Sequence, residues 1–474
     1  MAHSIKFGTD GWRAIIAEDF TFKNVELVTA AIADYILCTY GKEKPVLVGY
    51  DTRFLADKFA DAVAEILKCK GLNVLITENY VPTPVLAFSA KNLNTAGALM
   101  LTASHNPPEY CGIKYIPDYA GPATTEITNQ IVQNIDKNDV TQLKNSVKGT
   151  NCIKKFSPLQ DYFKHIEKII NFEKIKNSGI NICFDPLYAT TSGYFDKILE
   201  DHGCHVNVIH NWRDPLYGGG MPEPKEKYLK ELKQLVLKNS PSVGFSNDGD
   251  GDRFGVIDEK GNFITPNQVL AILLKHLIEN KNASGCLIKT VAGSLMLDKI
   301  AQNFGVEVIE TPVGFKWVGE AMRNNKTIIA GEESGGLSIG DHIPEKDGIL
   351  ANLLILEAMS YENKPLYKLV EEIEEETGIN FINHRIDLTV DDKTKENVIN
   401  IFSNNPPDEI NNLKIKEISK KDGIKLYFED NNSWILIRPS GTEPLLRIYF
   451  ETDSQKKLDE IVDEMKKIVE GSLG

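Results

Sequence analysis

Short apolar runs alternate with amphipathic stretches along most of the chain. In the first clear case, an apolar run at 45–51 precedes a stretch of helical periodicity at 59–70, and a second apolar run follows at 73–77. A strand, a helix and a strand of these lengths form a parallel βαβ unit. The same order of elements returns twice, at 180–185, 194–202 and 205–209 and at 286–290, 295–304 and 306–310. These widely separated copies predict three related α/β domains and exclude a solenoid of short repeats.

The remaining pattern completes the predicted layout. A helix is expected at 24–40, and a short strand with a glycine-rich turn is expected at 5–13, ending at Arg13. The stretch 137–156 is polar and irregular and is interpreted as a linker. After residue 380 the pattern predicts a smaller α+β domain, with strands at 383–390, 423–429, 433–438 and 445–451 and a last helix at 454–469. The expected domains are 1–145, 157–257, 258–370 and 380–474.

Composition narrows the class of protein. The 474 residues include 42% hydrophobic residues, which is ample for several folded cores, and the formal net charge is -14. This charge argues against a nucleic-acid surface and does not favour an acidic membrane as a partner. No apolar run is long enough to span a membrane, and the first residues lack an apolar signal core. The seven cysteines are scattered without a C-x-x-C pair, so reduced thiols and a cytoplasmic location are expected.

A serine loop provides the first candidate chemistry. The apolar run 96–101 reaches the polar stretch Thr102-Ala-Ser-His-Asn-Pro-Pro108. A serine on the loop that leaves a buried strand is expected to be exposed to a ligand, and His105 and Asn106 add hydrogen-bonding groups beside it. Taken alone, the stretch is more typical of an ordinary turn. Ser104 becomes a candidate nucleophile because other motifs require one.

Three aspartates, Asp248, Asp250 and Asp252, stand at alternate positions after an apolar strand and are separated by glycines. Alternate residues of an extended chain face the same way, so the carboxylates converge. Clustered anions repel one another unless a cation joins them, which favours a hard divalent metal. A calcium-binding EF-hand would require glycine where Arg253 stands, and no helix precedes this loop. Magnesium fits better, because it leaves coordination sites for water or for an oxygen of phosphorylated Ser104.

Two polar loops are candidates for binding a sugar phosphate. Glu332 and Ser334 lie in a glycine-bracketed loop after an apolar strand and could hydrogen-bond vicinal sugar hydroxyls, although a plain turn is as typical. A charged stretch at 341–348 then precedes a helix and would by default be solvated. The stretch Arg438-Pro-Ser-Gly-Thr-Glu-Pro444 combines a guanidinium, two hydroxyls and glycine N–H groups, which together favour an anion. Arg447 could add a second guanidinium.

Five motifs in order resemble the α-D-phosphohexomutase superfamily, in particular its phosphoglucomutase and phosphomannomutase branches. They span the chain and read Phe7-Gly-Thr-Asp-Gly-Trp-Arg13, Thr102-Ala-Ser-His-Asn-Pro107 with Gly112-Ile-Lys114, Asp248-Gly-Asp-Gly-Asp-Arg253, Gly331-Glu-Glu-Ser-Gly335 and Arg438-Pro-Ser-Gly-Thr-Glu-Pro444. The resemblance implies three related α/β domains with mixed sheets and a smaller C-terminal α+β domain around a central cleft. This agrees with the repeat found in the apolar pattern.

The resemblance also implies roles for individual residues. Ser104 would be the phosphoserine, and its phosphate together with the three aspartates would hold Mg²⁺. The implied catalytic positions are Ser104, His105, Lys114 and Lys346, and the implied substrate-binding positions are Arg13, Arg253, Gly314, Glu332, Ser334, Arg438, Ser440, Gly441, Thr442 and Arg447. The expected ligands are hexose phosphates and a hexose 1,6-bisphosphate, and the expected assembly is a monomer or a homodimer.

The expected reaction interconverts hexose 1-phosphate and hexose 6-phosphate, with glucose as the expected sugar. The Glu-Glu-Ser loop and the following Asp341-His-Ile-Pro-Glu-Lys-Asp-Gly348 look most like phosphoglucomutases. Gly336 stands where phosphomannomutase and phosphoglucosamine mutase branches often carry histidine, which weakens the amino-sugar alternative and leaves the general base open. Phosphomannomutase or dual specificity remains an alternative. A metal-dependent phosphatase with Asp248 as nucleophile would leave the Ser104 loop idle, and the complete motif set argues against a non-catalytic sensor.

Overall fold

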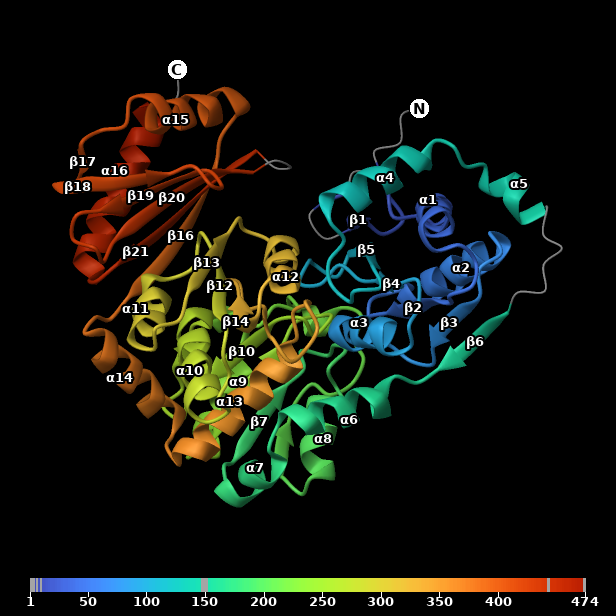
Figure 1. Ribbon diagram of the computed structural model, residues 1–474, viewed down its shortest axis with the longest axis horizontal. Coiled ribbons are helices and arrows are strands. Elements are labelled where there is room, and N and C mark those ends of the chain that lie inside the picture. The colour runs from blue at the N-terminus through green and yellow to red at the C-terminus, as the bar shows by residue number, and fades with distance from the viewer. Residues whose placement is uncertain (1–4, 6, 9–10, 146–151, 441–443, 472–474) are drawn as a thin grey trace.

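Four sheets organise the described chain, which comprises residues 5, 7, 8, 11–145, 152–440 and 444–471 of this computed structural model. Each sheet belongs to one domain, and the domains follow one another along the sequence (Figure 1). The first sheet has the order β1-β5-β4-β2-β3-β6. Its strands are β1 (Trp12–Ile15), β2 (Val46–Tyr50), β3 (Val74–Thr77), β4 (Ala98–Leu101), β5 (Tyr110–Ile116) and β6 (Ile153–Phe156), and its helices are α1 (Phe22–Tyr40), α2 (Ala56–Cys69), α3 (Thr83–Asn92), α4 (Thr125–Ile135) and α5 (Val140–Asn145).

The second and third domains repeat this plan with fewer strands, in the orders β11-β10-β9-β7-β8 and β13-β12-β14-β15. The second contains α6 (Leu159–Ile169), α7 (Phe172–Ser178), β7 (Ile182–Asp185), α8 (Phe195–Asp201), β8 (Val206–Val208), the 3₁₀ turns η1 (Tyr217–Gly219) and η2 (Glu226–Tyr228), α9 (Lys230–Lys238), β9 (Val243–Asn247), β10 (Phe254–Ile257) and β11 (Phe263–Ile264). The third contains α10 (Pro266–Glu279), β12 (Cys286–Thr290), α11 (Leu295–Asn303), β13 (Val308–Thr311), α12 (Phe315–Asn324), β14 (Thr327–Gly331), β15 (Leu337–Ile339), α13 (Gly348–Glu362) and α14 (Leu366–Thr377).

The predicted βαβ repeat is confirmed in all three domains. The first strand of each copy pairs in parallel with the second, as β2 with β3, β7 with β8 and β12 with β13. The same strand pairs in parallel on its other side with β4, β9 or β14. An antiparallel strand then follows, as β5, β10 or β15, so the sheets are mixed as expected. The loops after β4, β9 and β14 therefore occupy equivalent places in the three domains.

The fourth domain is the expected α+β unit, and its sheet is antiparallel, in the order β16-β21-β20-β19-β18-β17. Its elements are β16 (Ile382–Thr389), α15 (Asp392–Asn404), β17 (Glu409–Ile410), β18 (Leu413–Ser419), β19 (Ile424–Phe428), β20 (Trp434–Pro439), β21 (Leu445–Thr452) and α16 (Gln455–Gly471). The apolar pattern missed α15, β17 and β18. Strand β18 is largely exposed, so it lacks the apolar run that marks a buried strand.

The interpretation of 137–156 as an irregular linker is wrong in two places. Helix α5 and strand β6 both lie inside that range, while residues 146–151 are outside the described residues. Strand β6 pairs in parallel with β3 at the edge of the first sheet, and its two lysines face solvent. A short edge strand of this kind is polar, so its sequence resembles a loop.

One helix connects the cores of the domains. Helix α13 is hydrophobic all round and buried from Gly348 to Ser360, as expected for a helix enclosed by other elements. It starts at Asp347, whose side chain accepts hydrogen bonds from the N–H groups of Ile349 and Leu350. Its apolar cluster extends from α3 in the first domain through α6 and α10. The fourth domain has a separate core.

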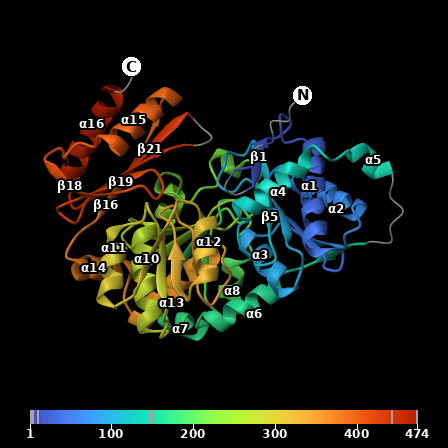
Figure 2. The same cartoon turned by 45° about the horizontal axis from the view of Figure 1, so that its top comes forward.

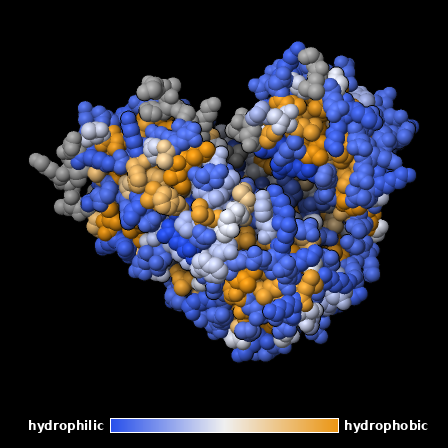
Figure 3. All heavy atoms as spheres, turned by 180° about the vertical axis from the view of Figure 1, so that it is seen from behind, coloured by the Kyte–Doolittle hydropathy of each residue, from blue (hydrophilic) through white to orange (hydrophobic). Residues whose placement is uncertain are grey.

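The first and fourth domains form two lobes above the second and third in both ribbon views (Figures 1 and 2). Seen from behind, a notch separates the two lobes, and the side chains deep in it are mostly hydrophilic (Figure 3). The notch corresponds to the central cleft that was expected.

Candidate active site

Three loops from three domains meet at one point. Ser104 follows β4, Asp248 follows β9, and Glu332 follows β14, so each lies beyond the carboxyl end of the equivalent parallel strand. In open α/β sheets, ligands bind at these strand ends. The Ser104 loop approaches the second domain so closely that a Cβ atom on Gly249 would lie 2.5 Å from the Ser104 carbonyl oxygen. Glycine at 249 is therefore required for this contact.

Ser104 lies directly against the aspartate cluster. Its hydroxyl donates to Asp248 Oδ2 at 2.8 Å and lies 3.3 Å from Nδ1 of His105. The side chain is only 2% exposed, so the expectation of an exposed serine is wrong. The Asp248 loop of the second domain covers it, which the sequence of one loop could not reveal. Ser104 also has a φ of +51°, a left-handed conformation that is rare for residues with a side chain and recurs at functional sites.

The three aspartates converge as their spacing predicted. Asp248, Asp250 and Asp252 are buried, and one carboxylate oxygen of each lies within 4.8 Å of the others. Burial, and then the charges of Asp252 and Asp250, raise the pKa of Asp248 well above its ordinary value. The buried Oδ1 of Asp252 has no hydrogen-bond partner in the described part of the chain. A set of hard oxygen ligands with excess negative charge fits a divalent cation such as Mg²⁺.

Two lysines from the neighbouring domains partly balance this charge. Lys114 on β5 places its Nζ 3.1 Å from Asp250 and 3.5 Å from Asp252, and Lys346 places its Nζ 2.9 Å from Asp252. Both side chains are buried. Thr83 also donates to Asp250 Oδ2 at 2.7 Å. The first and third domains thus each supply a buried cation to the acidic loop of the second.

The candidate phosphate-contacting arginines lie beside Ser104. Arg13 donates to Asn106 Oδ1 at 2.7 Å, and the backbone N–H of Arg253 donates to Asp248 Oδ1 at 3.0 Å. The Nε of Arg253 is buried and has no hydrogen-bond partner within the described ranges. The charge of Arg253, and then burial, lower the pKa of His105 well below its usual value. His105 is therefore neutral near pH 7.

Glu332 of the third domain is buried, and its Oε1 accepts from the N–H of Gly314 at 3.0 Å. Burial raises its pKa to about 7, and the cation of Lys346 opposes the shift. Ser334, two residues further on, is exposed. A Cβ atom on Gly336 would lie 2.3 Å from Lys346 Cδ, so the stem of Lys346 fills the place of a side chain at 336. The structure thus explains the glycine at this position.

The predicted phosphate loop belongs to the fourth domain. Arg438 on β20 and Arg447 on β21 are register partners, so both guanidinium groups project from the same face of the sheet. Ser440 donates its N–H to the carbonyl of Leu445 at 2.9 Å. The other two predicted members, Gly441 and Thr442, lie outside the described residues. Arg438 forms an ion pair of 2.9 Å with Asp422.

Four family models match consecutive parts of the chain. They describe the phosphoglucomutase/phosphomannomutase α/β/α domains I (residues 4–142), II (160–261) and III (265–376) and the C-terminal domain (391–468). The chain belongs to the phosphoglucomutase/phosphomannomutase family. It is a phosphohexomutase of the α-D-phosphohexomutase superfamily, as the five motifs predicted.

Known relatives of this phosphohexomutase carry different names. A phosphoglucosamine mutase from Methanocaldococcus jannaschii is 32% identical over 91% of this chain and 93% of its own length. A phosphoglucomutase/phosphomannomutase from Thermococcus kodakarensis is 30% identical over 98% of this chain and 99% of its own length. The crystal structure of a Thermus thermophilus protein, provisionally described as a phosphomannomutase, has a TM-score of 0.87 at 32% identity and covers 99% of this chain and 100% of its own. These relatives agree on the family and differ in the sugar that their names specify.

Sequence reasoning missed one residue that organises the serine loop. Arg53, just beyond β2, is fully buried, and all five of its N–H donors are used. Nη1 donates to the carbonyls of Pro107 and Tyr110, and Nη2 donates to those of Ser104 and Asn106, at 2.7–2.9 Å. Nε donates to Asp51 Oδ2 at 3.1 Å. An arginine two residues after a strand-ending aspartate was the available signal.

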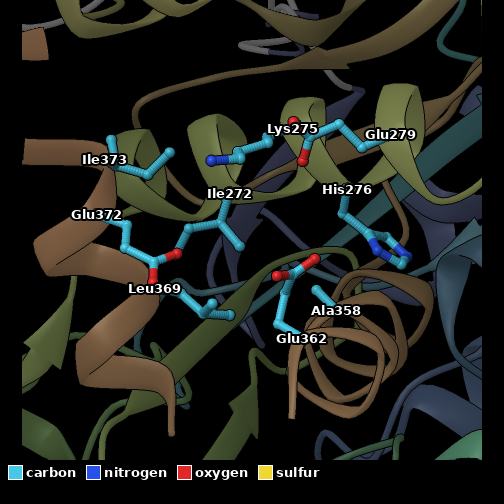
Figure 4. Close-up of a pocket in the computed structure, with 9 residues that line it drawn as sticks. All are labelled: Ile272, Lys275, His276, Glu279, Ala358, Glu362, Leu369, Glu372 and Ile373. Atoms are coloured by element: carbon cyan, nitrogen blue, oxygen red, sulfur yellow. The ribbon is translucent and has the colours of Figure 1, made fainter. Parts of the chain in front are cut away.

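A small cavity in the phosphohexomutase lies away from this site, between α10, α13 and α14 (Figure 4). Its volume is about 20 Å³, which is room for about one water molecule. Lys275, Glu279, Glu362 and Glu372 line it together with apolar side chains. It is far too small for a hexose phosphate.

None of the helices in the described ranges is long and apolar enough to span a bilayer.

Proposed function

We propose that this phosphohexomutase interconverts glucose 1-phosphate and glucose 6-phosphate through phosphorylated Ser104 and glucose 1,6-bisphosphate. The observation that carries the proposal is the 2.8 Å hydrogen bond between the Ser104 hydroxyl and Asp248 inside a buried carboxylate cluster. A hydroxyl in this position can carry a phosphoryl group whose oxygens face the cation site. A phosphatase using Asp248 as nucleophile would have no use for the strained Ser104 loop.

In the first half-reaction, a sugar hydroxyl attacks the phosphorus carried by Ser104. The new bond joins phosphorus to the sugar oxygen, the bond to Ser104 Oγ breaks, and the hydroxyl proton moves to a base. When bound by the three aspartates, Mg²⁺ would offset the negative charge that develops on the transferring group. The bisphosphate then turns over in the cleft and returns its other phosphoryl group to Ser104.

Three side chains are proposed for proton transfer. Neutral His105 lies 3.3 Å from Ser104 Oγ and can accept or relay a proton there. Lys114 of the first domain and Lys346 of the third are both held by the aspartates and can donate to a leaving oxygen. Because the reaction runs in both directions, the same group serves as base in one half-reaction and acid in the other.

The sugar and its distal phosphate are proposed to be held by the third and fourth domains. Glu332, fixed by the N–H of Gly314, would accept hydrogen bonds from vicinal hydroxyls, and exposed Ser334 would donate to them. Arg438 and Arg447, with Ser440, Gly441 and Thr442, would bind the distal phosphate, because planar guanidinium groups match phosphate oxygens. Arg13 and Arg253 would contact the phosphoryl group in transfer.

The relatives support a second candidate, phosphoglucosamine mutase, because several of them carry that name at 30–32% identity. One feature favours glucose. Glycine at 336, whose space is filled by the stem of Lys346, fits the phosphoglucomutase-like sequence of this loop.

Rates decide between these candidates. The values of kcat/KM for glucose 1-phosphate, mannose 1-phosphate and glucosamine 1-phosphate should be measured side by side with Mg²⁺ and the matching bisphosphate. The proposal expects the highest value for glucose, and a higher value for glucosamine would replace it. Peptide mass mapping after incubation with glucose 1,6-bisphosphate should place the phosphate on Ser104. Phosphate on Asp248, or full activity in Ser104→Ala, would contradict the mechanism.

A further inference from the structure

Asp422 occupies a place that no predicted role explains. It lies in the turn between β18 and β19, and its Oδ2 contacts nitrogen atoms of two different domains. Nη2 of Arg438 forms an ion pair with it at 2.9 Å, and the N–H of Val313 in the third domain donates a hydrogen bond to it at 2.8 Å. The Asp422 and Arg438 side chains are 23% and 17% exposed, so water screens this ion pair only in part.

The turn is built to deliver this carboxylate. Ile424 pairs with Ile437 in the sheet, which places the residues before 424 next to Arg438. Gly423 has a φ of +78°, and a Cβ atom there would lie 2.3 Å from the carbonyl oxygen of Ile437. Only glycine allows the chain to turn so close to β20. The contact between Asp422 and Arg438 is therefore fixed by the backbone.

The carboxylate sits where a phosphate would compete with it. A guanidinium offers two edges to a bidentate anion, and both edges include Nη2, the nitrogen that Asp422 contacts. Of the other two nitrogens, Nε of Arg438 is buried and lacks a hydrogen-bond partner in the described part of the chain. A negative charge at Nη2 neutralises the arginine and repels an arriving dianion.

The same carboxylate reaches toward the sugar-binding loop. Val313 is followed by Gly314, whose N–H donates to Glu332 Oε1 at 3.0 Å. Asp422 therefore connects Arg438, through two consecutive backbone N–H groups, to the carboxylate proposed to read the sugar. Beside it, Lys421 crosses the same boundary between domains and donates to the carbonyl of Glu310 at 2.8 Å, without contacting Arg438 in the described interactions.

We propose that Asp422 is a positioning residue that acts as an internal stand-in for the substrate phosphate. It holds Arg438 against the third domain until a phosphate takes the guanidinium from it, and it then keeps its hydrogen bond to Val313. The inference rests on the proposed role of Arg438 in phosphate binding. The contact between Asp422 and Arg438 weakens the affinity for phosphate. In return, it keeps Arg438 ordered and eases release of the product.

The test measures inhibition by inorganic phosphate, competing with hexose 1-phosphate, in a double-mutant cycle of Asp422→Asn and Arg438→Ala. Asparagine keeps an oxygen for the N–H of Val313 and removes the charge. Asp422→Asn alone should lower the inhibition constant of phosphate about three- to tenfold, as expected for removing one partly screened charge near a dianion. It should also lower kcat, because the product leaves more slowly. In the Arg438→Ala background, Asp422→Asn should have no effect on phosphate inhibition.

Each other outcome has a distinct meaning. An unchanged or higher inhibition constant in Asp422→Asn would overturn the inference, and so would an equal effect in both backgrounds, which would reveal only a general field. Lys421→Met is the matched control, because it loosens the same boundary and leaves Arg438 in contact with Asp422. If Lys421→Met lowered the constant as much, loosened docking would be the cause and the inference would fall. If Arg438→Ala alone changed nothing, the proposed phosphate site would be wrong.

Discussion

Replacing Arg53 with lysine should separate catalysis from binding in this phosphohexomutase. The guanidinium makes five hydrogen bonds, four of them to carbonyls of the serine loop, and the ammonium of lysine has three donors. At least two hydrogen bonds must be lost. Since each buried group left unpaired costs about 1–3 kcal/mol, Arg53→Lys should destabilise the loop by about 2–6 kcal/mol.

The loop responds by relaxing, because Ser104 is held at a φ of +51° that its own backbone does not favour. A displacement of about 1 Å at a reacting group costs on the order of 100-fold in rate, so kcat should fall about that much. Arg53 contacts no proposed substrate-binding group, so KM should change less than about threefold. The phosphorylation of Ser104 by glucose 1,6-bisphosphate, followed by quenched-flow mass measurement, should slow in parallel with kcat.

Arg213→Lys provides the control. Arg213 donates to the carbonyls of Thr52 and Arg53 at 3.1 and 3.0 Å, so it supports the same segment, but its described hydrogen bonds do not reach residues 104–110. Its kcat should stay close to that of the wild type. Both variants should be assayed well below their unfolding temperatures, measured first by thermal denaturation. A folded Arg53→Lys enzyme with normal kcat, or one whose KM rises while kcat holds, would refute the positioning role.

Three further predictions concern the loops. Asp248→Asn should raise the thermal stability of the metal-free enzyme at pH 7, because the raised pKa of Asp248 means that its charged form is disfavoured in the fold. With Mg²⁺, the same variant should lose several kcal/mol of transition-state stabilisation. A lower unfolding temperature than the wild type in EDTA would contradict the stability prediction. KM of the wild type should fall as the pH rises through about 7, where Glu332 ionises. In Glu332→Gln only the substrate phosphate titrates, so KM should change less over the same pH range. Identical pH profiles of KM in the two enzymes would contradict the role of Glu332. Gly336→Ala should displace the stem of Lys346 from its place beside Asp252 and lower kcat at least tenfold, roughly the loss of one charge-assisted contact, and a crystal structure would show the displacement.

The sequence predicts the fold well where burial is uniform. Apolar runs located β2, β7 and β12 and their partners, because a parallel strand covered on both faces is continuously hydrophobic. The pattern failed for β6 and β18, which are edge or exposed strands whose pairing depends on distant partners. It could not show how the domains dock, because docking brings together residues that have no fixed spacing in the chain.

The same distinction holds for the candidate site. The convergence of Asp248, Asp250 and Asp252 was predictable, since it depends on local spacing alone. The burial of Ser104 was not, because the covering loop comes from another domain. Arg53 and Asp422 were missed for the same reason. Arg53 contacts a loop about 50 residues away in the sequence, and Asp422 contacts one about 110 residues away. Neither residue belongs to a repeated motif.

The distribution of charge explains why three domains form one body and the fourth stands apart. The acidic loop of the second domain would be strongly repulsive alone, and its buried counter-charges are Lys114 from the first domain and Lys346 from the third. Separating any of these domains would leave buried charges unpaired, which is costly, so the shared apolar core and the shared site stabilise the same arrangement. The fourth domain has its own core and meets the third through a small apolar cluster, the partly exposed Asp422 and buried polar contacts such as the ion pair of Lys425 with Glu310. The fourth domain could therefore move against the third without breaking its own core, as the proposed turnover of a bisphosphate in the cleft would require.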